Sequence, residues 1–180
     1  MKEILEQIEK EIHEVIAQID EEQMSTFAGR IRPGKRIFVD GEGRSGFSAR
    51  GFAMRLMHLG YTVYFVGETI TPAVKEGDVF IAVSGSGTSA NVINDANRAK
   101  DKGAEVIAVT SKNGSQLALL SDYVFVIPGT VKGDSGEARH SIQLLSSLFD
   151  QSLHIVLDAV CLIISQRDHT ANEKAVRSHW

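Results

Sequence analysis

The sequence has almost no cysteine and no concentration of positive charge. Its single cysteine, Cys161, excludes a disulfide within the chain, and no Cys/His spacing typical of a metal site surrounds it. We therefore expect a reducing, cytoplasmic location, no bound metal, and a place in the core for Cys161. The net charge is −4 and the 19 Lys and Arg residues are scattered. The chain thus lacks the electrostatic basis for binding along a nucleic-acid backbone.

Long apolar runs are also missing. The first twenty residues are charged throughout and contain no apolar block like that of a signal peptide. The most apolar stretch, residues 153–164, is too short to span a bilayer and carries Asp158 near its middle. We expect a buried helix there and no membrane partner. Solenoid repeats and low-complexity tracts are absent too. With 180 residues, 43% of them hydrophobic, the chain is long enough for one domain.

The chain does contain an alternation of strand and helix patterns. Apolar residues recur at three- and four-residue steps through residues 4–19, which predicts a long N-terminal helix over residues 1–28. Strand patterns occupy residues 36–41, 62–67, 79–85, 105–111 and 123–129. Helical patterns separate most of them, and a final helix is expected at about residues 141–166. The alternation predicts an α/β fold, a doubly wound five-stranded parallel sheet of flavodoxin-like order 2-1-3-4-5, with helices on both faces.

Two loops rich in glycine and serine follow the first and third strands. They are residues 41–46, "GEGRSG", and residues 84–89, "SGSGTS". In an open parallel sheet, ligands bind beyond the carboxyl ends of the strands, and the order 2-1-3-4-5 makes these two loops neighbours. Either loop alone reads as ordinary turn and N-cap residues. Their joint position favours a phosphate-type ligand.

The second loop is the more informative of the two. It offers four hydroxyls and opens a helix, whose N-terminal amides and dipole favour an anion. Hydrogen bonds to a charged acceptor are worth on the order of 1.5–3 kcal/mol each, so three or four of them would hold one phosphate without a lysine.

The first loop also matches the fingerprint of dinucleotide-binding sites, Gly41-x-Gly43-x-x-Gly46. Glu68 lies at about the distance where such a site places its ribose-binding acid, so a nucleotide cofactor is one hypothesis. However, Arg44 and Ser45 suit a sugar or a single phosphate equally well, and the serine-rich loop has no standard role in a dinucleotide site. A compact phosphorylated ligand explains both loops.

Four stretches together resemble one known family. They are "GEGRSGFSARGFAMRLMHLG", "VGETITPA", "GDVFIAVSGSGTS" and "AKDKGAEVIAVTS", and they resemble 6-phospho-3-hexuloisomerases of the sugar isomerase (SIS) domain family over about residues 1–165. The resemblance implies a single SIS domain over residues 1–180 and a homotetramer, with the N- and C-terminal helices used in oligomerisation. It also implies interconversion of D-arabino-3-hexulose 6-phosphate and D-fructose 6-phosphate without a metal or organic cofactor.

The resemblance carries over to individual residues. The residues that it and the loop chemistry assign to the substrate are Gly43, Arg44, Ser45, Glu68, Ser84, Gly85, Ser86, Gly87, Thr88 and Ser89. In the family the final helix begins with a stretch like "QPMGSLFEQ", whose Glu is favoured for proton transfer. Here residues 143–151 read "QLLSSLFDQ", so the carboxylate is retained as Asp150. His179 matches a histidine near the family's C-terminus and is a further candidate catalytic residue, but the tail that follows it there is missing.

Other interpretations of these residues stay open. Asp150 could be a solvated or capping carboxylate, and the altered "QLLSSLFDQ" stretch also permits a non-catalytic sugar-phosphate-binding protein. Glu42 and Glu68 are alternative candidates for the catalytic carboxylate, since both lie at strand ends beside the expected ligand. Formaldehyde fixation through the ribulose monophosphate pathway and pentose supply are both compatible with the sequence.

For most histidines and for the least regular segment of the chain, we expect structural roles. His58 is expected to cap a helix or lie at a subunit contact. His154 is expected to be a core histidine, and His179 a frayed tail unless it reaches a neighbouring subunit. Residues 129–141, which include His140, resemble either a mobile loop over a site or an exposed connector, and composition favours the connector.

Overall fold

The fold is a parallel sheet covered by helices on both faces, as described by a computed structural model for residues 2–179. The strands are β1 (Arg36–Gly41), β2 (Thr62–Phe65), β3 (Val79–Val83), β4 (Glu105–Thr110) and β5 (Tyr123–Val126). They form one five-stranded sheet of order β2-β1-β3-β4-β5, and every neighbouring pair is parallel. The predicted α/β class and strand order are therefore confirmed.

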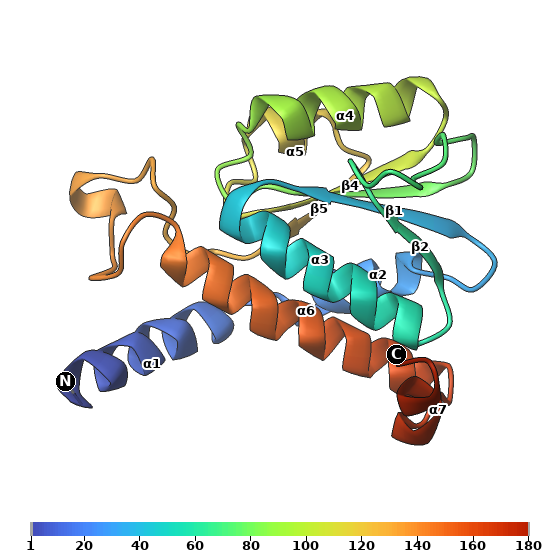
Figure 1. Cartoon of the computed structure of the whole chain (residues 1–180). Helices are drawn as coiled ribbons and strands as arrows, with labels where there is room; N and C mark the ends of the chain where they lie inside the picture. The colour runs from blue at the N-terminus through green and yellow to red at the C-terminus, as the bar shows by residue number, and fades with distance from the viewer. Residues whose placement is uncertain (1, 180) are drawn as a thin grey trace.

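The helices form a layer on each face of the sheet. They are α1 (Lys2–Ile16), α2 (Glu21–Arg30), α3 (Gly43–His58), α4 (Ala90–Asp101), α5 (Gln116–Leu120), a 3₁₀ turn η1 (Gly136–Ala138), α6 (Ser147–Arg167) and α7 (Asn172–Arg177). Figure 1 shows α4 and α5 on one face, α2, α3 and α6 on the other, and α1 lying beside α6.

Strand alternation divides the core into two parts. On β1, Ile37 and Val39 pack into the cluster formed with α2, α3 and α6. Phe38, between them, points to the opposite face and packs with α4 and α5. Successive side chains of a strand point to opposite faces, so β1 and β3, buried on both sides, read as continuous apolar runs. The central strands are thereby held rigidly between two helical layers.

The register brings the two predicted loops together. Gly41, the last residue of β1, is paired with Val83, the last residue of β3. The loops that follow these strands consequently start side by side at the carboxyl edge of the sheet, where neighbouring connections run in opposite directions.

The N-terminal segment differs from the single helix predicted over residues 1–28, of which residue 1 lies outside the described part. Helix α1 ends at Ile16, and α2 begins at Glu21. The Asp20 carboxylate accepts hydrogen bonds from the backbone N–H groups of Glu22 (2.9 Å) and Gln23 (3.0 Å). This side chain caps a new helix and lets the chain change direction, while the apolar period continues across the break.

The final helix also begins later than the predicted residue 141. Helix α6 starts at Ser147, and Leu145 just before it has a φ of 53°, in the left-handed region. A helix cannot pass through that conformation, so residues 141–146 form a separate loop. The predicted end near residue 166 agrees with the observed Arg167.

Helix α6 is a core helix of this fold. Among residues 2–179 it alone is long and apolar enough to span a membrane. However, 56% of its most apolar stretch is buried inside the fold. Its buried residues face α1, α2 and α3, as expected for the apolar run at residues 153–164. Cys161 lies in this core as predicted, and burial raises the pKa of its thiol to about 12.

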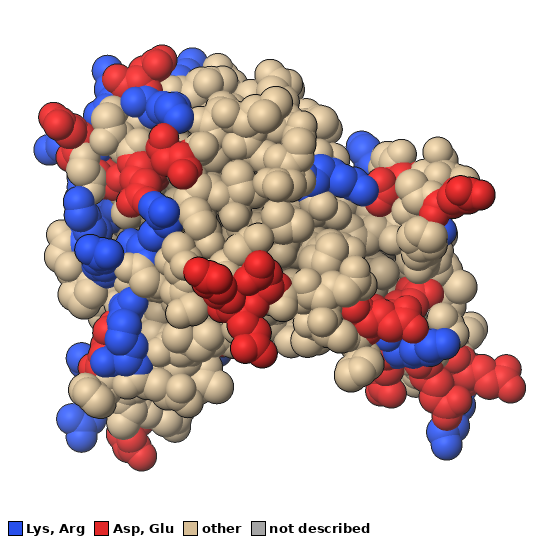
Figure 2. Space-filling view, turned by 180° about the vertical axis from the view of Figure 1, so that it is seen from behind, with Lys and Arg blue, Asp and Glu red and all other residues tan. Residues whose placement is uncertain are grey.

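Charges of both signs are interspersed on the surface. On the face seen in Figure 2, Lys and Arg side chains follow one another along the left edge with some Asp and Glu among them, and acidic side chains predominate at the centre and lower right.

Candidate active site

A cavity of about 550 Å³ opens at the carboxyl edge of the sheet, where the β1 and β3 loops meet. The predicted site residues that line it are Glu42, Gly43, Arg44, Ser45, Ser84, Gly85, Ser86, Ser89 and Asp150. The opposite wall is formed by Lys132 and residues 144–147. We call this hollow the central cavity. Residues that are 105 positions apart, such as Ser45 and Asp150, thus line one space.

Three helices begin at the central cavity without a side-chain cap. The N-cap residues of α3, α4 and α6 are Glu42, Ser89 and Ser146, and none of these side chains bonds the first turn of its helix. By contrast, Asp20 and Ser115 cap α2 and α5, which begin elsewhere. Uncapped N-terminal amides and the positive ends of three helix dipoles favour an anion in the space between them.

Three hydroxyls of the β3 loop, those of Ser84, Ser86 and Ser89, line this space. Ser84 Oγ lies 3.0 Å from Ser89 Oγ, and Ser86 Oγ lies 2.8 Å from Thr88 Oγ1. Each hydroxyl can donate as well as accept, so these pairs can reorient to donate to a bound oxyanion. The loop therefore supplies hydroxyl donors next to the α4 amides.

Two glycines of this loop are required by packing. A Cβ on Gly85 would come within 2.8 Å of Phe149 Cδ1 in the core. Gly87 has a φ of +64°, and a Cβ there would lie 2.0 Å from Ser115 Oγ. Gly87 faces Ser115 and, with the exposed Thr88, does not line the central cavity. Gly85 and Gly87 therefore shape the loop. Contact of Gly87 and Thr88 with the substrate stays a prediction.

Asp150 is the buried carboxylate of the cavity. It is only 5% exposed, its Oδ1 accepts a hydrogen bond from Ser45 Oγ at 2.6 Å, and its Oδ2 lies 3.8 Å from Arg44 Nε. Burial raises the pKa of Asp150, and the Ser45 hydroxyl and Arg44 oppose that rise. The interpretation of Asp150 as a solvated or capping carboxylate is thus wrong, because the side chain is enclosed and bonded to α3.

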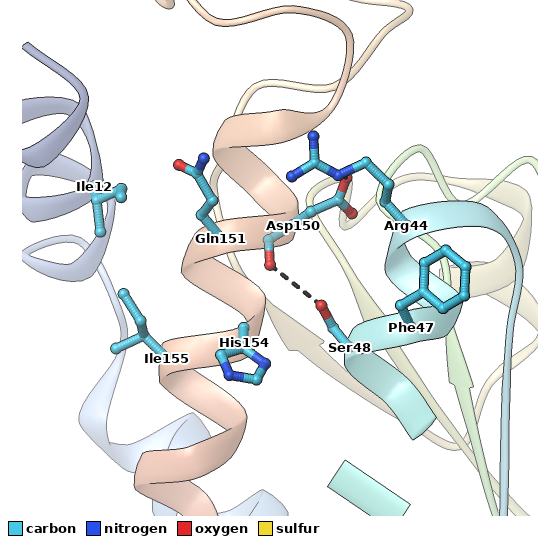
Figure 3. Close-up of a pocket in the computed structure, with 8 residues that line it drawn as sticks. All are labelled: Ile12, Arg44, Phe47, Ser48, Asp150, Gln151, His154 and Ile155. Carbon is cyan, nitrogen blue, oxygen red and sulfur yellow. Dashed lines mark hydrogen bonds and ion pairs between the residues drawn. The ribbon is translucent and has the colours of Figure 1, made fainter. Parts of the chain in front are cut away.

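Arg44 ties the two sides of the cavity together. Its Nη1 donates to Ser147 Oγ at 2.8 Å, so it spans from α3 to the first turn of α6. Figure 3 shows Arg44 extending towards the Asp150 carboxylate, while the Ser48 hydroxyl bonds the Asp150 carbonyl at 3.4 Å. The helix that carries Asp150 is therefore fixed to the β1 loop by side-chain and backbone contacts.

A second hollow of about 440 Å³ lies on the outer side of Asp150, between α1, α3 and α6 (Figure 3). Ile12 and Ile155 line it from α1 and α6. His154 also lines it, with its side chain 60% exposed and 3.7 Å from Asp158. The expectation of a core histidine is wrong here, since position 154 falls on the outer side of α6 rather than on its buried stripe.

The glycine fingerprint of the first loop has a packing explanation. A Cβ on Gly46 would lie 2.5 Å from the Gly41 carbonyl oxygen, so α3 can cross the end of β1 only with glycine there. Glu68, the acid that a dinucleotide site would need, pairs instead with Arg50 at 2.9 Å. Both residues line a separate hollow beside β2. Glu68 is therefore outside the central cavity, and the geometry does not support the nucleotide hypothesis.

His179 lies far from Asp150 within the chain. Its ring is 5.2 Å from the ring of buried His58, at the C-terminal end of α3. Asp150 is in the first turn of α6, and the rest of that helix, to Arg167, is about 25 Å long. Figure 1 shows the C-terminus at that far end. One chain therefore does not bring His179 to the cavity, and its catalytic role stays a prediction that needs a neighbouring subunit.

Glu42 does lie at the central cavity. Its Oε1 accepts a hydrogen bond from Asn91 Nδ2 at 2.6 Å. The side chain is exposed, unlike that of Asp150. Glu42 therefore stays a second candidate carboxylate.

The wall opposite the serine loop was not predicted from the sequence. Lys132 belongs to the irregular segment 129–141, for which composition favoured a connector, yet it lines the central cavity. Its backbone N–H donates to Ser146 Oγ at 3.1 Å. The other interpretation of that segment, a loop over a site, therefore holds for Lys132, while His140 lines a different hollow. Across residues 2–179 no three His, Cys, Asp or Glu side chains gather in a way that would hold a metal ion.

Comparison with known proteins places this geometry in a family. Residues 30–147 match the SIS domain family. The chain is 43% identical to the 3-hexulose-6-phosphate isomerase of Mycobacterium gastri, over 92% of this chain and 82% of that protein. It is 36% identical to the protein of the same name from Bacillus subtilis, over 98% of this chain and 96% of that protein.

A solved structure agrees with these sequence matches. A Methanococcus jannaschii protein, described as having an inferred function of 3-hexulose-6-phosphate isomerase, superposes with a TM-score of 0.84 at 30% identity. The match covers 100% of this chain and 98% of that one. The chain therefore belongs to the SIS domain family and groups by sequence with relatives named 3-hexulose-6-phosphate isomerase.

Proposed function

We propose that this chain is a sugar-phosphate isomerase that interconverts D-arabino-3-hexulose 6-phosphate and D-fructose 6-phosphate. The observation that carries the proposal is the position of buried Asp150 on the same cavity as three uncapped helix N-termini and the serine loop. The names of the Mycobacterium gastri and Bacillus subtilis relatives support the choice of substrate.

In the proposed mechanism the phosphate is bound by the β3 loop and the amides that begin α4. Hydroxyls of Ser84, Ser86 and Ser89 donate to its oxygens, and Ser45 and Arg44 face the sugar chain from α3. Holding one end of the substrate in this way orients the carbon chain against Asp150. This binding requires no metal or organic cofactor.

Asp150 then acts as the base. It removes the proton from C2 of the 3-ketose, next to the C3 carbonyl, and an enediol forms across C2 and C3. The same carboxyl group returns a proton to C3 as the carbonyl forms at C2. Burial raises the pKa of Asp150, which makes its carboxylate a stronger base. Glu42, which also lines the central cavity, is the second carboxylate that could relay a proton between the two oxygens.

We further propose that the chain assembles as a tetramer in the cytoplasm through its terminal helices. Ile4 and Leu5 on α1 and Leu162 on α6 are 57–60% exposed, which supports a role for these helices in oligomerisation. In such an assembly His179 would serve a neighbouring subunit's cavity rather than its own.

A coupled assay tests the reaction. Purified chain is expected to convert 3-hexulose 6-phosphate to fructose 6-phosphate, followed by the production of glucose 6-phosphate and NADPH in the presence of coupling enzymes. Turnover in the presence of EDTA is expected to equal turnover without it. Absence of turnover, together with tight binding of fructose 6-phosphate in calorimetry, would instead support a non-catalytic sugar-phosphate-binding protein. Binding of NAD without binding of the sugar phosphate would revive the nucleotide hypothesis.

A further inference from the structure

Glu11 is a buried carboxylate on α1 that the proposed mechanism does not use. It is 3% exposed, although the other acidic residues of α1 lie at the surface. Its Oε2 accepts hydrogen bonds from Ser141 Oγ at 2.6 Å and Gln143 Nε2 at 3.2 Å, and its Oε1 accepts one from the Ile142 backbone N–H at 3.0 Å. Three consecutive residues of one loop therefore converge on a single carboxylate.

These contacts hold the carboxylate in its charged form. Burial alone would raise the pKa of Glu11, but the hydrogen bonds from Ile142, Ser141 and Gln143 lower it. Bonds to an ionised acceptor are about twice as strong as neutral ones. We call Glu11 and the three loop residues that it binds the Glu11 clamp.

The clamped loop continues directly into the wall of the central cavity. Leu144 and Leu145 follow the clamp and line the cavity, and Leu145 has a φ of 53°. L-residues rarely adopt this left-handed conformation, so surrounding contacts must maintain it. Arg139 supplies part of that support by donating to the carbonyls of Gln143 and Leu145. Glu11 adds support from outside the loop by bonding the three residues that precede Leu144.

We propose that Glu11 is a positioning residue, which holds the Leu144–Leu145 wall against the non-phosphorylated part of the bound sugar. This proposal rests on the proposed function for its substrate. Glu11 touches neither the cavity nor Asp150, so it acts only through the loop. Asp150 is held independently by Ser45 and by α6. Loosening the clamp should therefore weaken substrate binding more than it slows proton transfer.

Kinetics of Glu11→Ala separate these two effects. We expect KM to rise by about tenfold, which corresponds to the loss of about one hydrogen bond to a charged group, while kcat stays within about threefold of wild type. Glu11→Gln keeps the length and one acceptor oxygen, so it should recover most of the lost affinity. Glu14→Ala is the matched control, because Glu14 is on the same helix with its side chain 57% exposed. It should leave both constants unchanged.

Hydrogen exchange gives a readout that does not depend on turnover. Amides of residues 139–146 should exchange at least about tenfold faster in Glu11→Ala than in wild type or Glu14→Ala, because the loop opens locally. If Glu11→Ala does not fold, Ser141→Ala carries the test with the same readouts and a smaller expected change, because it removes one donor from an intact Glu11.

Two results would overturn the proposal. One is a folded variant with wild-type KM and wild-type exchange at residues 139–146. The other is a fall in kcat of about tenfold, as large as the rise expected for KM, while KM itself stays unchanged. If the wild-type chain itself does not isomerise the sugar, the proposed function fails. The role of Glu11 is then tested by hydrogen exchange and by calorimetry, which compares the affinities of wild type and Glu11→Ala for fructose 6-phosphate.

Discussion

Asp150 shows how one residue can combine burial with reactivity. Its carboxylate is enclosed by α3 and α6, yet it lines the central cavity and accepts a hydrogen bond from Ser45. Burial favours the neutral form and raises the pKa of Asp150, whereas Ser45 and Arg44 favour the charged form and oppose that rise. A raised pKa would make the carboxylate a stronger base in the proposed role of Asp150 as the group that accepts and returns a proton.

Asp150→Asn should therefore lose activity while it keeps its structure. The amide oxygen can still accept the bond from Ser45, but it cannot take up a proton, and kcat should fall by about 10²- to 10⁴-fold. Binding of fructose 6-phosphate, measured by calorimetry, should change little. Asp158→Asn is a suitable control, because Asp158 is on the same helix with its side chain 55% exposed. Full activity in Asp150→Asn would assign the base elsewhere, with Glu42 next in order.

Sequence reasoning identified Asp150 but missed Glu11. Asp150 could be found because it follows a recognisable stretch of the final helix. Glu11 looks like any acidic residue on an amphipathic helix, and its partner Ser141 is 130 positions away. Nothing local distinguishes a carboxylate that will be buried by a distant loop. The same holds for His154, whose exposure depends on which side of α6 meets α3.

At the scale of elements, the short loop between β3 and α4 links the serine hydroxyls to the position of α6. Gly85 lies against Phe149, the residue directly before Asp150. Any side chain at position 85 must push α6 away from the sheet, since Phe149 is fully buried and has little room to move. The distance between the serine loop and Asp150 thus depends on an apolar contact, that of Gly85 with Phe149.

Gly85→Ala is expected to impair both stability and catalysis. Its Cβ would approach Phe149 Cδ1 to 2.8 Å and Val131 Cγ1 to 2.9 Å. Overpacking of this kind costs about 1–3 kcal/mol, and a displacement of the base by about 1 Å can lower kcat on the order of a hundredfold. Gly114→Ala is the control, because nothing lies within 4 Å of the added atom. Urea unfolding and steady-state kinetics would measure the two effects, and unchanged kcat in Gly85→Ala would contradict the coupling.

The elements themselves were predictable to different degrees. The five strands and their order follow from apolar runs of strand length and from the rule for parallel sheets. The breaks at residues 17–20 and 141–146 were missed, because each depends on a side chain that competes with the helix. Asp20 caps α2, and the Glu11 carboxylate takes the Ile142 amide out of any longer α6. A helical period in the sequence does not reveal such competition.

At the scale of the whole molecule, one buried group makes stability depend on pH. Asp40, at the end of β1, is 6% exposed, and its Oδ2 has no hydrogen-bond partner among residues 2–179. Burial and the nearby Asp95 carboxylate raise the pKa of Asp40 from 3.8 to about 6. Between these two values the folded chain holds a proton that the unfolded chain has lost. Stability from this group is therefore present below about pH 4 and is lost as the pH rises through 6.

Comparison with Asp40→Asn isolates this contribution. The amide introduced at position 40 does not titrate. The free energy of unfolding of the variant relative to wild type should therefore rise by on the order of 1–3 kcal/mol between pH 4 and pH 7.5. Urea denaturation at a series of pH values would measure the difference. Curves for the two proteins that stay parallel across this range would show that Asp40 titrates normally.

The three uncapped helix starts around the cavity have a consequence for how such a protein can diverge. Main-chain amides are present whatever the side chains are, so few substitutions can remove these candidate anion-binding groups. The cavity wall at Leu144 and Leu145, by contrast, is made of side chains that can be exchanged one at a time. If these amides bind the phosphoryl group as proposed, related proteins can retain that binding while they change which carbon skeleton they accept.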